Sequence, residues 1–232
     1  MLRKIKFVAA IVALMVLIVL CQAGGGLLKK GFMKGRESSE TATSAGRGRL
    51  IVLDPGHGGI DGGKKGINGA EEKEINLQIS LIIKELLEKE NVEVVMTRSD
   101  ENRIGEDQVS DLKARVDIMN RENPVLAVSI HQNSYHEESV HGAQVFYYSE
   151  SKEGARAASM LQEALREADP ENTKEAKAND TYYILKKTEV PTVIAECGFL
   201  SNYEEAEKLI TEDYQRKMAE AIVKGILQYI EE

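Results

Sequence analysis

The amino-acid sequence predicts an α/β domain with a mainly parallel sheet that is covered by helices on both faces. Three observations support this fold class. Residues 50–96 have the pattern of strand, helix and strand within about 45 residues, the arrangement of a βαβ unit with parallel strands. Residues 125–130 form an unbroken apolar run, as expected for a strand buried on both faces. Strand and helix patterns then alternate to the C-terminus, which is typical of α/β proteins.

The first half of this pattern contains two strands and the helix between them. Residues 50–53 are apolar and are followed by Asp54-Pro55-Gly56, which ends a strand. Seven of the 19 glycines lie between Gly56 and Gly69, so a glycine-rich loop follows. The next segment has apolar residues at helical spacing, and residues 92–96 predict the second strand. The apolar stripe of this helix consists of Ile75, Ile79, Ile82, Ile83, Leu86 and Leu87.

The second half continues the alternation of helices and strands. After a helix expected near residues 112–119, strands are expected at 125–130, 143–148 and 192–195. Pro170 opens a polar loop between the last two strands. The remaining predicted helices cover residues 155–165, 203–209 and 214–230.

Charge is divided unevenly along the 232 residues. The formal net charge is −8, but nine of the 30 basic residues and only two of the 38 acidic residues precede residue 50. Residues 50–232 therefore carry a net charge of −15. A domain this acidic repels a phosphate backbone, so we expect no nucleic-acid partner.

The N-terminus has the pattern of an export segment. Arg3, Lys4 and Lys6 precede an uncharged, mostly apolar run to Ala23. We expect residues 1–23 to be a signal peptide or an uncleaved membrane anchor, with a buried core helix as the plainer alternative. Residues 24–49 are rich in glycine, serine and threonine, which predicts a flexible linker. The domain of residues 50–232 is then extracytoplasmic, secreted or anchored through the N-terminal segment alone.

Residues capable of metal binding or acid–base chemistry follow three of the predicted strands. His57 comes shortly after the first strand, His131 directly follows residues 125–130, and Glu196 directly follows residues 192–195. Ligands of open α/β sheets bind beyond the carboxyl ends of the strands, so these side chains are expected to converge. A fourth acid, Glu71 or Glu72, stands just before the first helix.

Two histidines and one carboxylate are the protein ligands of many catalytic zinc sites. Zinc lowers the pKa of a bound water, and a second carboxylate must stay free to accept the proton and pass it to a leaving amine. His57, His131 and one glutamate supply such a ligand set, and Glu196 supplies the free acid. A pair of buried, structural histidines is the alternative.

Four ordered segments resemble the motifs of the zinc-dependent N-acetylmuramoyl-L-alanine amidases, the amidase-3 family. They are residues 51–59, 72–77, 129–133 and 196–202, so the resemblance covers the chain from about Leu50 to its end. It implies a twisted sheet flanked by helices, and one Zn²⁺ per chain held by His57, Glu72 and His131. It also implies that Glu196 is catalytic, that the substrate is peptidoglycan, and that the bond cleaved joins the lactyl group of N-acetylmuramic acid to L-alanine.

Within that family the chain most resembles the sporulation and germination amidases that prepare spore-cortex peptidoglycan. The short tethered form, residues 142–148 and residues 224–227 carry this resemblance. It implies that the enzyme strips peptide from muramic acid so that a downstream deacetylase can form muramic-δ-lactam. We expect the forespore intermembrane space as one location, and an accessory protein as a further partner to test.

Three residues are candidates for substrate contact. Arg98 and Arg115 could pair with substrate carboxylates, although such arginines more often pair with nearby acids. Asn133, two residues after His131, could bind substrate or support the site. Asp54 could orient His57 or simply cap the turn. Cys197 should point away from Glu196, because side chains alternate along a strand, and is expected to be a buried, inert thiol.

Other functions fit parts of this pattern. The chain could be another zinc hydrolase of the cell wall, such as a peptidase or a deacetylase. The sequence lacks a His-Glu-x-x-His helix, which argues against one common class of zinc protease. A non-catalytic module that binds wall or partner is the alternative from another class, but the complete set of two histidines and two glutamates argues against it.

Overall fold

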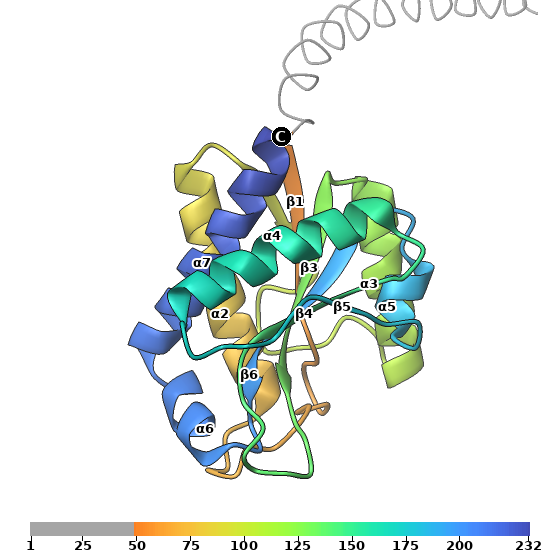
Figure 1. The fold of residues 1–232 in the computed structure, drawn as a ribbon. Coiled ribbons are helices and arrows are strands. Elements are labelled where there is room, and N and C mark those ends of the chain that lie inside the picture. The colour runs from red at the N-terminus through yellow and green to blue at the C-terminus, as the bar shows by residue number, and fades with distance from the viewer. Residues whose placement is uncertain (1–48) are drawn as a thin grey trace, which may run out of the picture. The chain divides into compact units, whose positions relative to one another are not determined.

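A computed structural model describes residues 49–232 of the chain (Figure 1). The predicted export segment and most of the predicted linker lie outside these described residues. Within residues 49–232, no helix combines the length and the apolar character that a membrane crossing requires.

The six strands form one sheet in the order β2-β1-β3-β6-β4-β5. The pairs β1–β2, β1–β3, β3–β6 and β4–β5 are parallel, and β4 runs antiparallel to β6. The predicted α/β class with a mainly parallel sheet is therefore confirmed. The strands are β1 (Leu50–Pro55), β2 (Glu93–Met96), β3 (Leu126–Asn133), β4 (Gln144–Tyr147), β5 (Lys177–Ala178) and β6 (Thr192–Phe199).

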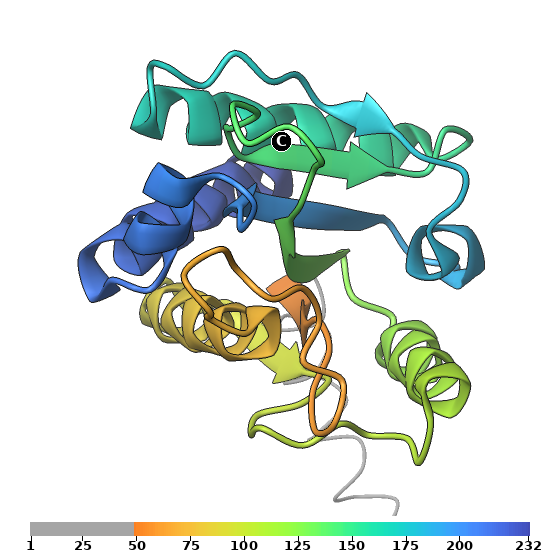
Figure 2. The same cartoon turned by 90° about the horizontal axis from the view of Figure 1, so that it is seen from below.

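Helices cover both faces of the sheet, as Figure 2 shows in the view along the layers. On one face α2, α4 and α7 pack on the main core, which includes Leu53, Ile130 and Ala195. On the other face α3 and α5 cover Val52, Ala127 and their neighbours. The helices are α2 (Glu72–Lys89), α3 (Gln108–Glu122), α4 (Lys152–Ala168), α5 (Tyr183–Lys187), α6 (Tyr203–Leu209) and α7 (Glu212–Glu231).

Capping residues set several helix boundaries. Helix α3 begins four residues earlier than its apolar pattern predicts, because Asp107 and Ser110 form a capping box. The Asp107 side chain accepts a hydrogen bond from the backbone N–H of Ser110, and the Ser110 hydroxyl accepts one from the backbone N–H of Asp107. Helix α7 begins after Thr211, whose hydroxyl accepts from the N–H of Tyr214. Strand β5 and helix α5 were not expected from the sequence; they have two and five residues.

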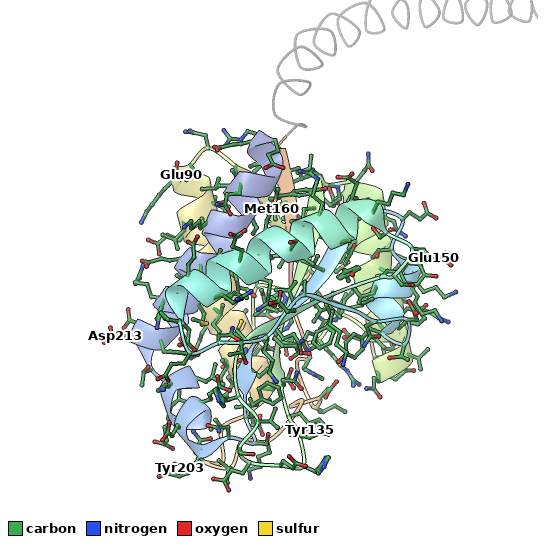
Figure 3. All side chains as sticks on the ribbon, viewed as in Figure 1. Glu90, Tyr135, Glu150, Met160, Tyr203 and Asp213 are labelled. Atoms are coloured by element: carbon green, nitrogen blue, oxygen red, sulfur yellow. The ribbon has the colours of Figure 1, made fainter. Side chains whose placement is uncertain are left out.

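The register of the central strands brings their carboxyl ends together. Pro55 pairs with Ile130 across β1 and β3, and His131 pairs with Glu196 across β3 and β6. The register shifts between His131 and Asn133. The carboxyl ends of β3 and β6 therefore lie side by side, together with the loop that precedes α2. They are at the lower end of the domain in Figure 1. Exposed Tyr135 and Tyr203 project from the same end (Figure 3).

Candidate active site

Three of the predicted residues form a cluster that could hold a metal ion. His57, Glu72 and His131 each offer one ligand atom, and these three atoms lie within 4.8 Å of one another. Glu72 Oε2 is 3.2 Å from His57 Nε2, and Glu72 Oε1 is 2.8 Å from His131 Nδ1. Atoms bound ~2.0–2.1 Å from one tetrahedral zinc ion lie ~3.3 Å apart. The donor types fit zinc, and one ligand atom from each residue lies close enough to the others to share one ion.

Two of the ligands, His131 and Glu72, reach the cluster from opposite faces of the sheet. His131 and Glu196, which are register partners, lie on the face covered by α3 and α5, because their strand neighbours Ile130 and Ala195 belong to the opposite core. Glu72 is the first residue of α2, which packs on that opposite face. The cluster thus sits across the carboxyl edge of the sheet. Glu71, the other candidate acid, is the N-cap of α2 and pairs with Lys73.

Hydrogen bonds fix the position of the Glu72 carboxylate. Besides the two imidazoles, it accepts from the backbone N–H groups of Lys64 and Gln132 and from the side-chain amide of Asn76. Burial alone would raise the pKa of Glu72. The hydrogen bonds and charges of His131 and His57 outweigh burial and hold this pKa well below the usual glutamate range. Glu72 is therefore ionised and prepared to accept a cation.

Asp61 orients His57 from its other ring nitrogen. His57 Nδ1 donates to Asp61 Oδ2 at 3.0 Å, which turns Nε2 toward Glu72. Metal-bound histidines commonly have such a carboxylate partner. Burial lowers the pKa of His57, but the hydrogen bond and charge of Glu72, followed by those of Asp61, raise it to about 9. The site attracts positive charge strongly, as a cation site must.

Two glycines leave the space that the ligands occupy. A Cβ on Gly56 would lie 2.2 Å from Cε1 of His131, and a Cβ on Gly63 would lie 2.6 Å from Oε2 of Glu72. Gly63 also has φ +70, a conformation that favours glycine. Part of the glycine-rich loop is therefore required by the cluster itself.

Glu196 lies beside the cluster as a buried carboxylate. It is 6% exposed, and among the described residues its Oε2 has no hydrogen-bonding partner. Burial is the main cause that raises the pKa of Glu196 to about 7. The charge of Glu72 adds to this shift, and the charges of His131 and His57 oppose it. Such a group can exchange a proton near neutral pH.

Cys197 is on the other face of β6, fully buried in the main core. Burial, together with the charge of Glu196, raises the pKa of its thiol. The prediction of a buried, inert thiol agrees with this position.

The candidate substrate residues are placed differently from one another. Arg98 is 5% exposed and Arg115 is 1% exposed, and both donate their hydrogen bonds to protein groups. These contacts favour a structural role over substrate contact. Asn133 ends β3 and is partly exposed, so substrate contact by Asn133 remains a prediction. Asp54 does not contact His57 directly; it accepts from Thr97, Ser129 and Arg115.

Asp61, Asn76 and Tyr182 were not predicted from the sequence. Asp61 and Asn76 each lie four positions after the ligand that they contact, a spacing that could have indicated them. Tyr182 caps α5 and packs edge-to-face on Phe146, with ring centroids 5.7 Å apart. Burial, and then the charges of Glu196 and Glu72, raise the pKa of the Tyr182 phenol. Nothing in the sequence around Tyr182 indicated this.

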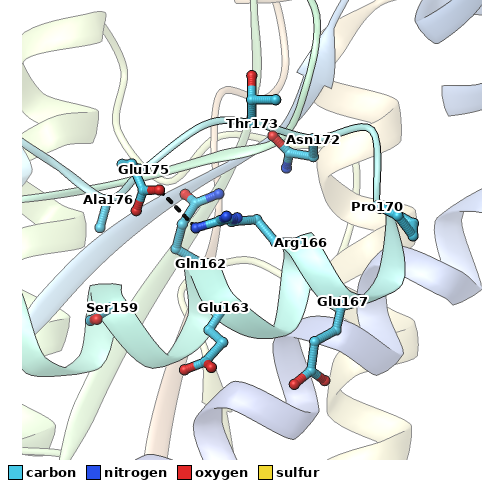
Figure 4. Close-up of a pocket in the computed structure, with 10 residues that line it drawn as sticks. All are labelled: Ser159, Gln162, Glu163, Arg166, Glu167, Pro170, Asn172, Thr173, Glu175 and Ala176. Carbon is cyan, nitrogen blue, oxygen red and sulfur yellow. Dashed lines mark hydrogen bonds and ion pairs between the residues drawn. The ribbon is translucent and has the colours of Figure 1, made fainter.

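Two of the ligands, His57 and His131, border open space on the side of α3 and α5. A small crevice there is lined by His57 and His131, by Gln108 and Leu112 of α3, and by Ile184 of α5. A separate hollow beside α4 is shown in Figure 4. Two of its polar side chains bond to protein groups: Arg166 pairs with Glu175, and Gln162 bonds to the backbone of β4 and of the residue before it. The three candidate ligands and Glu196 do not line that hollow.

An α/β sheet whose carboxyl edge bears two histidines, one glutamate and a free buried carboxylate has the arrangement of a metal-dependent hydrolase. The chain belongs to the N-acetylmuramoyl-L-alanine amidase family (Amidase_3), whose sequence profile matches residues 51–228. The resemblance seen in the four motifs is thereby confirmed.

Known proteins agree with this assignment. The germination-specific N-acetylmuramoyl-L-alanine amidase of Bacillus subtilis is 35% identical over 193 residues, covering 80% of this chain and 81% of that protein. Among solved structures, the CwlD amidase of Clostridioides difficile in complex with the GerS lipoprotein is 36% identical with a TM-score of 0.76, covering 79% of this chain and 98% of that one. AmiC2 of Nostoc punctiforme is 32% identical with a TM-score of 0.73, covering 80% and 98%.

Proposed function

We propose that the chain hydrolyses the amide bond between the lactyl group of N-acetylmuramic acid and L-alanine in peptidoglycan. The observation that carries this proposal is the unpaired, buried carboxylate of Glu196 beside the His57–Glu72–His131 cluster. Family membership supports the substrate, and the ligand geometry supports one zinc ion per chain.

The roles of the side chains follow from their positions. His57, Glu72 and His131 would hold the zinc ion, which would supply Lewis-acid chemistry and lower the pKa of a water toward ~7. Glu196 accepts the proton of the attacking water and then donates it to the nitrogen of L-alanine as the C–N bond breaks. Burial raises the pKa of Glu196 above the usual glutamate range, which suits a group that must be deprotonated first and protonated later. Asp61 and Asn76 keep His57 and Glu72 in place.

We further propose a role in spore-cortex maturation, with a deacetylase acting next to form muramic-δ-lactam. The similarity to the germination-specific amidase and to CwlD supports this role. The CwlD amidase was solved in complex with the GerS lipoprotein, and by analogy we propose an accessory protein partner for this chain. Action outside the cytoplasm, with residues 1–23 as signal peptide or anchor and residues 24–49 as linker, agrees with a cell-wall substrate.

The reaction is tested by mass spectrometry of the products released from purified peptidoglycan by the zinc-loaded chain. An amidase releases stem peptides that begin with a free L-alanine amine and leaves intact muramic acid on the glycan. A peptidase would leave L-alanine attached to the glycan, a deacetylase would release acetate, and a non-catalytic module would release nothing.

Glu196→Gln tests the acid–base role. This variant should bind zinc as the wild type does but turn over about 100-fold more slowly or worse, the usual effect of losing general acid–base catalysis. The matched control is Glu205→Gln, because Glu205 is equally buried, at 6% exposure, but bonds to the backbone N–H groups of Phe199 and Gly142. Near-normal turnover in Glu196→Gln would remove Glu196 from the mechanism.

A further inference from the structure

Two buried arginines hold the backbone turn that carries His57. Arg98 donates from Nε to the carbonyl of Pro55 at 2.9 Å and from Nη2 to the carbonyl of Gly56 at 2.9 Å. Arg115 donates from Nη1 to the carbonyl of Pro55 at 2.7 Å and from Nη2 to the carbonyl of His57 at 2.6 Å. Three consecutive carbonyl groups therefore accept hydrogen bonds from guanidinium groups.

The turn needs such support because its backbone is strained. His57 has φ 63, in the left-handed region that residues other than glycine rarely occupy. Strained residues persist where surrounding contacts determine their conformation. The bond from Arg115 to the carbonyl of His57 is one such contact, and the ring of His57 is held separately by Asp61.

Each guanidinium is itself fixed in place. Arg115 is held by charge-assisted bonds to Asp54 and Asp111, both at 2.7 Å. Arg98 Nη2 also donates to the carbonyl of Lys73 at 2.8 Å. The same nitrogen thus bonds to the carbonyls of Gly56, just before His57, and of Lys73, just after Glu72. Arg98 therefore links the backbone segments that carry His57 and Glu72.

We propose that Arg98 and Arg115 are positioning residues that fix the spacing between His57 and Glu72 and thereby set the affinity of the site for zinc. The inference rests on the proposed function only in taking His57 and Glu72 as zinc ligands. Substrate binding is a poor alternative, since both side chains are almost fully buried and their donors are engaged by the protein. Lysine cannot replace either arginine, because a single ammonium group cannot reach several diverging carbonyls as a planar guanidinium does.

The test compares the zinc affinity of the full chain and its variants by competition with a chelator, at a temperature where every variant is folded. Arg98→Lys should bind zinc ~10–100-fold more weakly, the usual effect of losing a group that supports a metal ligand. The absorption spectrum of the cobalt-loaded variant should also change, because the ligand positions change. Arg115→Lys is the second variant and should act in the same direction.

Two controls separate positioning from a general loss of stability. Gln162→Ala removes a buried side chain that bonds to the backbone around β4, a strand that carries none of the three ligands, and should lower thermal stability with wild-type zinc affinity. Arg166→Lys changes an exposed arginine and should change neither property.

Three results would overturn the inference. One is wild-type zinc affinity in Arg98→Lys. Another is an equal loss of affinity in Gln162→Ala. The third is a higher KM for peptidoglycan in Arg98→Lys with unchanged zinc affinity, which would instead indicate substrate binding. A wild-type chain that binds zinc but releases no stem peptide would refute the proposed reaction and leave the positioning role standing.

Discussion

Gly56→Ala is the substitution that tests the geometry of the metal cluster most directly. The added Cβ would lie 2.2 Å from Cε1, 2.3 Å from Nε2 and 2.7 Å from Nδ1 of His131. The backbone of Gly56 has little freedom to move away, because its N–H bonds to Ile130 and its carbonyl accepts from Asn76 and Arg98. The imidazole of His131 must therefore move.

The size of this movement follows from ordinary contact distances. To bring the closest pair from 2.2 Å to 3.4 Å, the ring must withdraw by about 1.2 Å. Metal–ligand distances tolerate deviations of only about 0.2 Å, so the position of His131 Nδ1 becomes unsuitable for the ion. We expect zinc affinity to fall by at least ~100-fold, the upper end of what losing a supporting group costs.

The assay is zinc competition with a chelator, and the control lies in the same loop. In Gly62→Ala the new Cβ would meet only the side chain of Glu71, at 3.3 Å, and this half-exposed side chain can move aside. Gly62→Ala should keep wild-type affinity. If Gly56→Ala binds zinc as tightly as the wild type, the placement of His131 against Gly56, and the reasoning built on it, is wrong.

Three further predictions concern protons and the groups around the cluster. Because the pKa of His57 in the metal-free chain is about 9, its proton competes with zinc, so affinity should rise about tenfold per pH unit up to that pH; a flat profile in a pH series of zinc titrations would contradict this. Asp61→Asn removes the charged partner of His57 and should weaken zinc binding ~10–100-fold in the same titration; unchanged affinity would show that this partner does not matter. Burial opposes ionisation of Asp54, but the charge of Arg115 and the hydrogen bonds to the carboxylate lower the pKa of Asp54. The contribution of ionised Asp54 to stability is therefore complete at neutral pH and is lost as pH falls through this lowered pKa. Asp54→Asn should therefore lower the free energy of unfolding by ~3–5 kcal/mol at neutral pH, and the gap from wild type in urea unfolding should narrow only below pH ~4; a gap that persisted in acid would assign the loss to something other than charge.

The fold was predictable where the sequence pattern is long and periodic. The apolar stripe from Ile75 to Leu87 and the apolar run before His131 became α2 and β3. The direction of β4 was not predictable, because residues 143–148 look the same in a parallel or an antiparallel pair. Strand β5, with two exposed residues, carries no periodicity at all. Helix α5 is only five residues long, too short for a helical stripe to be recognised.

The proposed metal ligands and the proposed catalytic acid could be predicted from the sequence, but the residues that hold them in place could not. The rule that ligands lie beyond strand ends was enough to single out His57, His131 and Glu196 for a shared site, and these three do converge. The choice of Glu72 over Glu71 needed the family resemblance, and in the structure the difference is burial, at 2% for Glu72. The contacts of Arg98 could not be foreseen, because they are to backbone carbonyl groups, which carry no sequence signature.

The order of the strands divides the sheet into two blocks, each made from one continuous stretch of chain. Strands β2, β1 and β3 come from residues 50–133, and strands β6, β4 and β5 come from residues 144–199. All three proposed ligands belong to the first block and the proposed acid belongs to the second, and His131 pairs with Glu196 across the seam. Along the chain, the last of the three proposed ligands, His131, therefore precedes the proposed acid, Glu196, by some sixty positions. Helix α7, the last along the chain, packs on both α2 and α4 and so fastens the two blocks together. The metal ligands and the proposed acid thus come from different stretches of the chain, and the pairing of β3 with β6 and the packing of α7 hold them together.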